Sequence, residues 1–163
     1  MGQKKIQSLS RKLVQLDDGT ELPFDLFFGI PKHVAPKVVI QSGMIEKGWI
    51  PVEKKNLKTK YPGVYAIGDV TSVGTPKAGV FAEGAAKIAA ASIIAELNNE
   101  EHASIYTGAG SCYLEFGEGK VARVDVDFFS GPSPMGVHYE ASETLVVEKD
   151  NFGSSRKARW FGL

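Results

Sequence analysis

Gly68 and Asp69 are the first residues whose types and spacing could form a ligand-binding site. They follow directly after the apolar run Val64–Ile67. A glycine lets the backbone come close to a ligand because it carries no side chain. A carboxylate just beyond it can accept hydrogen bonds from the hydroxyls of a ribose or a ribityl chain. The alternative is a simple turn with a solvated acid, and the dipeptide alone does not separate the two interpretations.

Lys77 follows shortly after, at the start of a predicted helix. Thr75 offers an N-cap oxygen and Pro76 suits the first helical position, so we expect a helix of about twenty residues ending near Leu97. The free N–H groups of its first turn carry partial positive charge and could face an electron-rich ring edge. A lysine gains nothing from the helix dipole there, which favours a functional reason over a solvated charge.

Cys112 is the one cysteine of the chain, which excludes an internal disulfide and a cysteine-based zinc site. Cys112, Leu114 and Phe116 alternate with polar neighbours, as in a half-buried strand. A cysteine in such a pattern is typically a small buried hydrophobe. The other interpretation is a reactive thiolate.

The predicted helices and strands that carry these residues indicate a fold of the α/β class. Residues 11–30 read as two strands around an Asp18-Gly19 turn, and within them the apolar run Leu26–Ile30 suits a buried strand. Val64–Ile67 predicts a further buried strand, followed by the small-residue helix. Residues 111–129 predict a hairpin with its turn at the sequence GEG.

The amino-acid composition excludes some classes of function. The 163 residues include 19 basic and 19 acidic side chains, so the net charge is about zero, which argues against a general nucleic-acid binder. No apolar run has the length of about 18 residues that crosses a membrane. The single cysteine is compatible with a reducing compartment, and we expect a cytoplasmic protein.

The basic and aromatic tail, residues 148–163, leaves two interpretations open. Trp160 and Phe161 beside Lys157 and Arg159 would suit a surface that meets lipid headgroups or a quinone, giving a peripheral membrane contact. The favoured interpretation is a tail that packs on the core or forms a dimer interface, because the apolar residues are too few for firm attachment to a membrane.

The stretch LKTKYPGVYAIGDV resembles the second FAD motif of the pyridine-nucleotide–disulfide oxidoreductase superfamily, with Thr59, the run Val64–Ile67, Gly68 and Asp69 in the expected order. Upstream, LDDGTELPFDLFFGIP looks like the strands that close the nucleotide-binding insertion of that superfamily. Downstream, GTPKAGVFAEGAAKIAAASI is similar to the helix of its sulfide:quinone oxidoreductase branch. The resemblance covers roughly residues 11–100.

The resemblance implies roles for the matched positions. Gly68 would let the backbone approach FAD, and Asp69 would bind its ribityl chain. Lys77 with the backbone of Ala78 and Gly79 would lie near the pyrimidine edge of the flavin, where a positive charge stabilises the anionic reduced ring.

In the same branch a cysteine after the FAD helix pairs with a second cysteine from the nucleotide-binding half, and the two relay sulfur and electrons to the flavin. Cys112 stands in the similar place, and the partner cysteine is absent from this sequence. Also absent is the G-x-G-x-x-G element that holds the FAD pyrophosphate. We therefore expect a C-terminal portion of such a flavoprotein, which by itself is inactive and binds FAD weakly or not at all.

This interpretation divides the chain into three regions: the end of a nucleotide-binding insertion (1–36), the C-terminal half of an FAD-binding domain (37–102), and a hairpin with a tail (103–163). The parent activity it implies passes electrons from sulfide through a cysteine pair and FAD to quinone. One alternative is an NADH:quinone-type flavoprotein, in which Cys112 plays no part. Another is a non-catalytic dimerisation or interaction domain, since a partial fold should expose an apolar face and self-associate.

Overall fold

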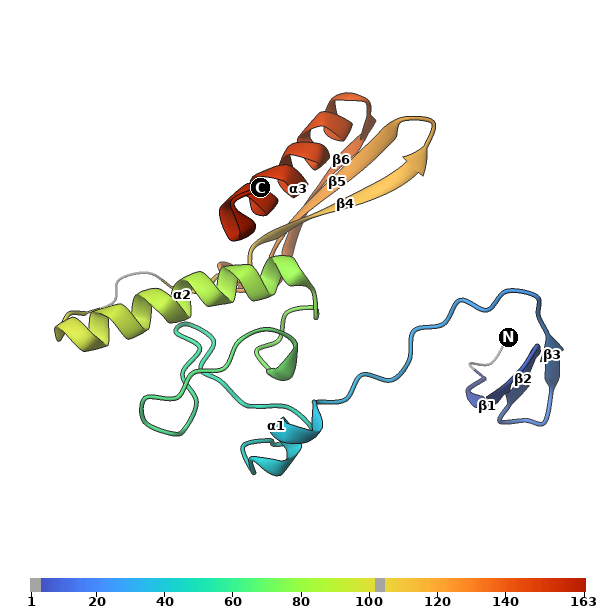
Figure 1. The fold of residues 1–163 in the computed structure, drawn as a ribbon, viewed down its shortest axis with the longest axis horizontal. Coiled ribbons are helices and arrows are strands. Elements are labelled where there is room, and N and C mark those ends of the chain that lie inside the picture. Colours follow the sequence, from blue (N-terminus) through green and yellow to red (C-terminus); the bar gives the residue numbers. More distant parts are fainter. Residues whose placement is uncertain (1–3, 102–104) are drawn as a thin grey trace. The chain divides into compact units, whose positions relative to one another are not determined.

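The computed structural model describes residues 4–101 and 105–163 and divides into two compact units (Figure 1). The first unit ends at His33 and the second runs from Val34 to Leu163. This division falls close to the predicted boundary after residue 36. The other predicted boundary, after residue 102, lies outside the described residues. What the three predicted regions do stays a prediction.

The first unit is a three-stranded antiparallel sheet in the order β1-β2-β3. Its strands are β1 (Ile6–Ser10), β2 (Leu13–Leu16) and β3 (Glu21–Pro23). The turn between β2 and β3 contains Gly19 at a φ of +82°, and the Thr20 N–H donates to Asp18 Oδ1 at 3.1 Å. The predicted turn at Asp18-Gly19 is therefore confirmed.

The predicted strand Leu26–Ile30 is wrong. This run forms no strand, and three of its side chains are largely exposed, with 73% of Leu26, 88% of Phe28 and 89% of Ile30 accessible to solvent. A strand needs a neighbour that satisfies its backbone N–H and C=O groups. Within the described residues no other segment pairs with this run.

The second unit joins an irregular loop region to a long helix and a second sheet. Its elements are α1 (Lys37–Gln41), the 3₁₀ turn η1 (Gly68–Val70), α2 (Gly79–Asn98), β4 (Gly110–Gly117), β5 (Lys120–Asp127), β6 (Met135–Ser142) and α3 (Thr144–Phe161). The sheet is antiparallel in the order β4-β5-β6. The predicted hairpin over residues 111–129 is thus confirmed, whereas β6 and α3 were not predicted.

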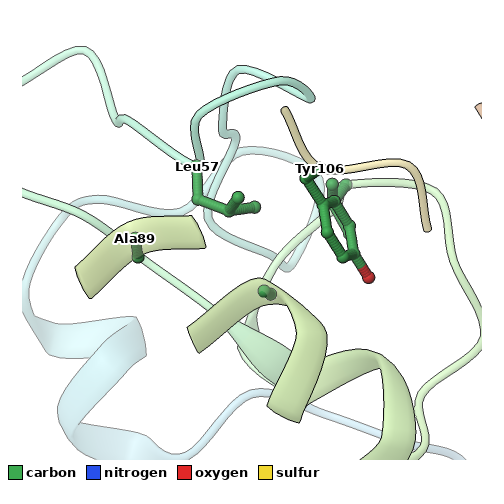
Figure 2. Close-up of a cluster of buried hydrophobic side chains, with 5 residues drawn as sticks. Leu57, Ala89 and Tyr106 are labelled. Carbon is green, nitrogen blue, oxygen red and sulfur yellow. The ribbon is translucent and has the colours of Figure 1, made fainter. Parts of the chain in front are cut away.

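A hydrophobic core forms between α2 and the loops on either side of it (Figure 2). Leu57 is completely buried, and it packs in one cluster with Val73, Ala85, Ala89 and Tyr106. The small alanine side chains of α2 let the loops approach the helix closely, while alanine also favours the helical backbone. The Tyr106 hydroxyl donates to the Phe81 carbonyl at 3.1 Å, which satisfies the buried phenol.

The helix α2 has the predicted length but begins later than predicted. Its N-cap is Ala78, which has an extended backbone with φ −148° and ψ 150°, so Thr75 is not the cap and Lys77 precedes the helix. The helix ends at Asn98, and the next residue, Asn99, has a left-handed φ of 56°, a common way to terminate a helix.

The helix α3 covers one face of the second sheet (Figure 1). The Tyr113 hydroxyl of β4 donates to Glu148 Oε1 of α3 at 2.7 Å, and the Tyr113 ring packs edge-on against Phe152. Arg123 of β5 pairs with the same glutamate. The beginning and middle of the tail therefore pack on the sheet, whereas Trp160 and Phe161 at its end are exposed.

The second buried strand predicted at Val64–Ile67 is also wrong. Only Tyr65 forms an isolated bridge, with Lys58, and both ends of the run are more than one third exposed. Within the described residues the pairs between the strands β1–β6 are all antiparallel, and the one parallel bridge, between Ile50 and Thr71, is isolated, so this run has no parallel sheet to join. The fold is a mixed arrangement of helices and two small antiparallel sheets, compatible with the α/β class, and a partial dinucleotide-binding domain stays a proposal.

Candidate functional site

The turn at Gly68 brings the loop directly onto α2. Gly68 has a φ of +70°, and a Cβ at this position would lie 3.3 Å from the Cβ of Ala82. The Gly68 carbonyl accepts hydrogen bonds from the Thr71 N–H at 3.1 Å and from Thr71 Oγ1 at 2.9 Å. A residue without a side chain is therefore required both for the backbone conformation and for the close approach.

Replacing Gly68 with alanine should destabilise the second unit by about 1–2 kcal/mol, because an L-residue is strained at this φ and its methyl group would crowd Ala82. Urea denaturation followed by circular dichroism measures the loss. Gly79→Ala is the matched control, since Gly79 begins α2 with open space around it and an ordinary φ. Equal stability of the two variants would contradict the assigned role of Gly68.

Lys77 folds back onto the loop that precedes it. Its ammonium group donates to the carbonyls of Asp69 and Thr71, the latter at 3.0 Å, and lies 3.6 Å from the centroid of the Trp49 ring. Burial lowers the pKa of Lys77, and the negative charge of Asp69 partly opposes this shift. Lys77 is therefore neither in the first helical turn nor a freely solvated charge.

Trp49 was missed by the sequence interpretation. It ends a tight turn in which Glu46 and Trp49 exchange two backbone hydrogen bonds, with Lys47 and Gly48 both at positive φ. The Lys-Gly pair before an aromatic residue is the signal that could have indicated this turn. It could not have indicated that the indole ring meets Lys77, because the 27 residues between them must fold first.

The loop and the start of α2 together enclose a small cavity of about 10 Å³. It brings together four of the predicted site residues, and Gly79 follows directly as the first residue of α2. The lining consists of Gly68, Asp69, Thr71, Val73, Thr75, Pro76, Lys77, Ala78, Phe81, Ala82, Ala85 and Tyr106. This volume holds about one water molecule, so a larger ligand would lie across the opening.

The opening of the cavity has the groups that bind a polar ligand. Asp69 is exposed, and within the described chain its carboxylate accepts no hydrogen bond. No described side chain caps α2, and its first turn contains no acidic residue, so its N–H groups keep their partial positive charge. A hydroxyl donor facing Asp69 and an electron-rich group facing α2 would both be accommodated.

Cys112 lies outside this cavity, on β4. The prediction of a buried side chain is wrong, since Cys112 is exposed. The opposite face of β4 is the one that packs, because Tyr113 points toward α3. Cys112 aligns across the sheet with Val124 and His138, so these three residues share the face that α3 leaves uncovered.

The face of β4 that carries Cys112 also lies next to the start of α2. Gly110, two residues before Cys112, faces the same way, and a Cβ there would lie 2.9 Å from the Phe81 ring and 3.1 Å from Val80. Phe81 also lines the cavity. The described residues contain no group of three or more acidic, histidine or cysteine side chains that could hold a metal ion.

No protein-family model matches the chain. Its sequence is 28% identical over 128 residues to the mitochondrial sulfide:quinone oxidoreductase of Mus musculus, covering 77% of this chain and 28% of that protein. It is 29% identical over 123 residues to the enzyme of the same description from Schizosaccharomyces pombe, covering 72% of this chain and 27% of the relative.

A shorter similarity extends to the ferredoxin–NADP reductase of Metallosphaera sedula, at 36% identity over 74 residues, or 45% of this chain and 22% of that protein. The chain thus covers between 22% and 28% of the length of these curated relatives. These distant likenesses are to flavoprotein oxidoreductases in general.

Proposed function

We propose that this chain is the C-terminal portion of an FAD-dependent oxidoreductase of the sulfide:quinone type. In the complete protein, electrons would pass from sulfide through Cys112 and a second cysteine to FAD, and then to quinone. Asp69 would accept hydrogen bonds from the ribityl hydroxyls. The N-terminus of α2, with Lys77, Ala78 and Gly79, would face the pyrimidine edge of the flavin.

The observation that carries the proposal is the grouping of Gly68, Asp69, Lys77 and Ala78 around one opening at the start of α2. A free carboxylate beside an uncapped helix N-terminus matches a ligand with hydroxyl donors next to an electron-rich ring. Cys112 supports the proposed redox reaction, because its thiol is exposed. It also lies on the same face of β4 as Gly110, which is close to Val80 and Phe81 in the first turn of α2.

The isolated chain should bind FAD weakly or not at all, because it lacks the G-x-G-x-x-G element that would hold the pyrophosphate. Absorbance of the purified chain measures this directly, and stoichiometric flavin would contradict the expectation. The matched experiment is a chimera in which this chain replaces the aligned segment of the mouse sulfide:quinone oxidoreductase. The chimera should retain FAD.

In the chimera, Asp69→Asn should weaken FAD binding by about tenfold, since an amide accepts hydroxyl hydrogen bonds less strongly than a carboxylate. Equilibrium dialysis of the flavin gives the dissociation constant. Asp127→Asn is the control, because among the described residues the hydrogen-bond partners of Asp127 are Phe129 and Ser130 of its own loop. Equal flavin affinity of the two variants would remove Asp69 from the site.

A pyridine-nucleotide-dependent flavoenzyme is the second candidate, because of the similarity to a ferredoxin–NADP reductase. In that case NADH or NADPH would reduce the flavin and Cys112 would be dispensable. The donor that reduces the chimera distinguishes the two candidates, as developed in the Discussion.

The surface of the second unit has exposed apolar side chains that another molecule could cover. Ile94 and Leu97 of α2 are 58% and 77% exposed, as expected for a helix face that a further segment or a second copy would cover. Trp160 and Phe161 are exposed near basic residues, which would suit a peripheral membrane contact. None of the described helices is long and apolar enough to cross a membrane. Cytoplasmic localisation stays a prediction.

A further inference from the structure

Every backbone carbonyl from Gly68 to Thr71 is engaged by a specific donor. Thr71 itself donates to the Gly68 carbonyl, and the Ile50 N–H donates to the Val70 carbonyl at 2.9 Å. The remaining two, of Asp69 and Thr71, both accept from Lys77. One ammonium group thus closes a network that fixes the main chain on both sides of the Asp69 side chain.

The ring of Trp49 also contacts the ammonium group of Lys77. Its ring centroid lies 3.6 Å from Lys77 Nζ, close enough for a strong cation–π contact. The ring is itself fixed by the tight turn with Glu46 and by its neighbour Ile50, which pairs with Val70 and Ser72. The indole and the turn that carries Asp69 therefore belong to one hydrogen-bonded assembly.

We propose that Trp49 and Lys77 form a positioning pair that fixes the Gly68–Thr71 turn and leaves the Asp69 carboxylate free to accept the hydroxyl groups of the ligand. This inference rests on the proposed function for the identity of the ligand and adds Trp49 to the site. Lys77 acts through the backbone that carries Asp69. The loop and Trp49 together orient the Lys77 side chain.

The electrostatics agree with this arrangement. An ammonium group that is partly buried loses hydration, and two carbonyls and an aromatic face replace the lost water. Burial accordingly lowers the pKa of Lys77, while Asp69 acts in the opposite direction. The carboxylate and the ammonium group make no direct hydrogen bond in the described chain, so the charge of Lys77 supports Asp69 without occupying its oxygens.

Hydrogen exchange of the complete 163-residue chain tests the pair without any flavin. Lys77→Met and Trp49→Leu should each speed exchange of the Thr71 and Ser72 amides by about tenfold, because the turn then opens more often. Lys77→Arg should restore slow exchange, since a guanidinium can donate to both carbonyls and stack on the indole. Unchanged exchange in Lys77→Met or Trp49→Leu overturns the proposal, as does failure of the arginine variant.

The matched control is Lys54→Met, because Lys54 makes a cation–π contact with Phe129 elsewhere in the same unit. It should leave the exchange of the Thr71 amide unchanged; faster exchange there would mean that any lost cation–π contact loosens the unit, and it would overturn the specific role of the pair.

A second measurement separates positioning from general stability. In a Trp160→Phe background Trp49 is the sole tryptophan, so its fluorescence should change when Lys77 loses its proton, at a pH below the usual pKa of a lysine. Lys77→Met should abolish this transition, and its persistence would overturn the contact. Neither measurement involves FAD. A failure of the pair is therefore distinguishable from a failure of the flavin site, which the flavin content of the chimera decides.

Discussion

Replacing Cys112 with serine in the chimera should reduce sulfide-dependent flavin reduction by roughly a hundredfold or more. A thiolate can attack one sulfur of a disulfide and expel the other as a thiolate, and two cysteine thiols can form a disulfide as two electrons pass to the flavin. A serine hydroxyl can do neither. The exposed position of Cys112 on β4 leaves the thiol accessible for this chemistry. The measurement is the anaerobic bleaching of the flavin after addition of sulfide.

Ser111→Ala is the control for the cysteine variant, because Ser111 is adjacent but faces the opposite side of β4. It should reduce the flavin at the unchanged rate. Full sulfide-dependent reduction in Cys112→Ser would remove Cys112 from the mechanism. If NADH or NADPH reduces the flavin equally well in both variants while sulfide reduces it in neither, the pyridine-nucleotide candidate replaces the sulfide one.

Leu57→Ala should destabilise the second unit by about 3 kcal/mol. Leu57 is completely buried, and its truncation leaves a cavity among Val73, Ala89 and Tyr106 (Figure 2). Urea denaturation followed by circular dichroism measures the change in the free energy of unfolding. Because Tyr106 lines both the core cluster and the candidate site, we also expect weaker FAD retention in the chimera.

The same substitution at Leu97 provides the control. Leu97 lies on α2 and is 77% exposed, so its replacement by alanine should change the unfolding free energy by less than about 0.5 kcal/mol. Equal effects at positions 57 and 97 would mean that the cluster around Leu57 is not the core of this unit.

Local patterns predicted those elements whose partners are close in the chain. The hairpin of β4 and β5 has its alternation and its turn within about twenty residues, and the Asp18-Gly19 turn lies between two adjacent strands. The length of α2 follows from its run of helix-favouring alanines. In each case the hydrogen bonds that form the element connect residues of one short segment.

Apolar runs without a local partner were predicted wrongly. Leu26–Ile30 and Val64–Ile67 have the composition of buried strands, but a strand requires a neighbour to satisfy its backbone. Within the described residues no segment pairs with Leu26–Ile30, and Val64–Ile67 meets the Leu57–Thr59 stretch through one isolated bridge instead of a sheet strand. Periodicity likewise indicated that Cys112 alternates with its neighbours, but it could not decide which face α3 would cover.

By itself, the sequence determined the Gly68-Asp69 turn, the small-residue helix after it and the single cysteine, because these depend on residue type and local spacing. Only the tertiary structure decided that Lys77 turns back to the carbonyls of Asp69 and Thr71 beneath Trp49. A lysine side chain can reach solvent, a ligand or its own loop, and the choice depends on which distant groups desolvate it. The indole of Trp49 desolvates Lys77, and it lies beside Lys77 because Ile50 pairs with the loop after Asp69.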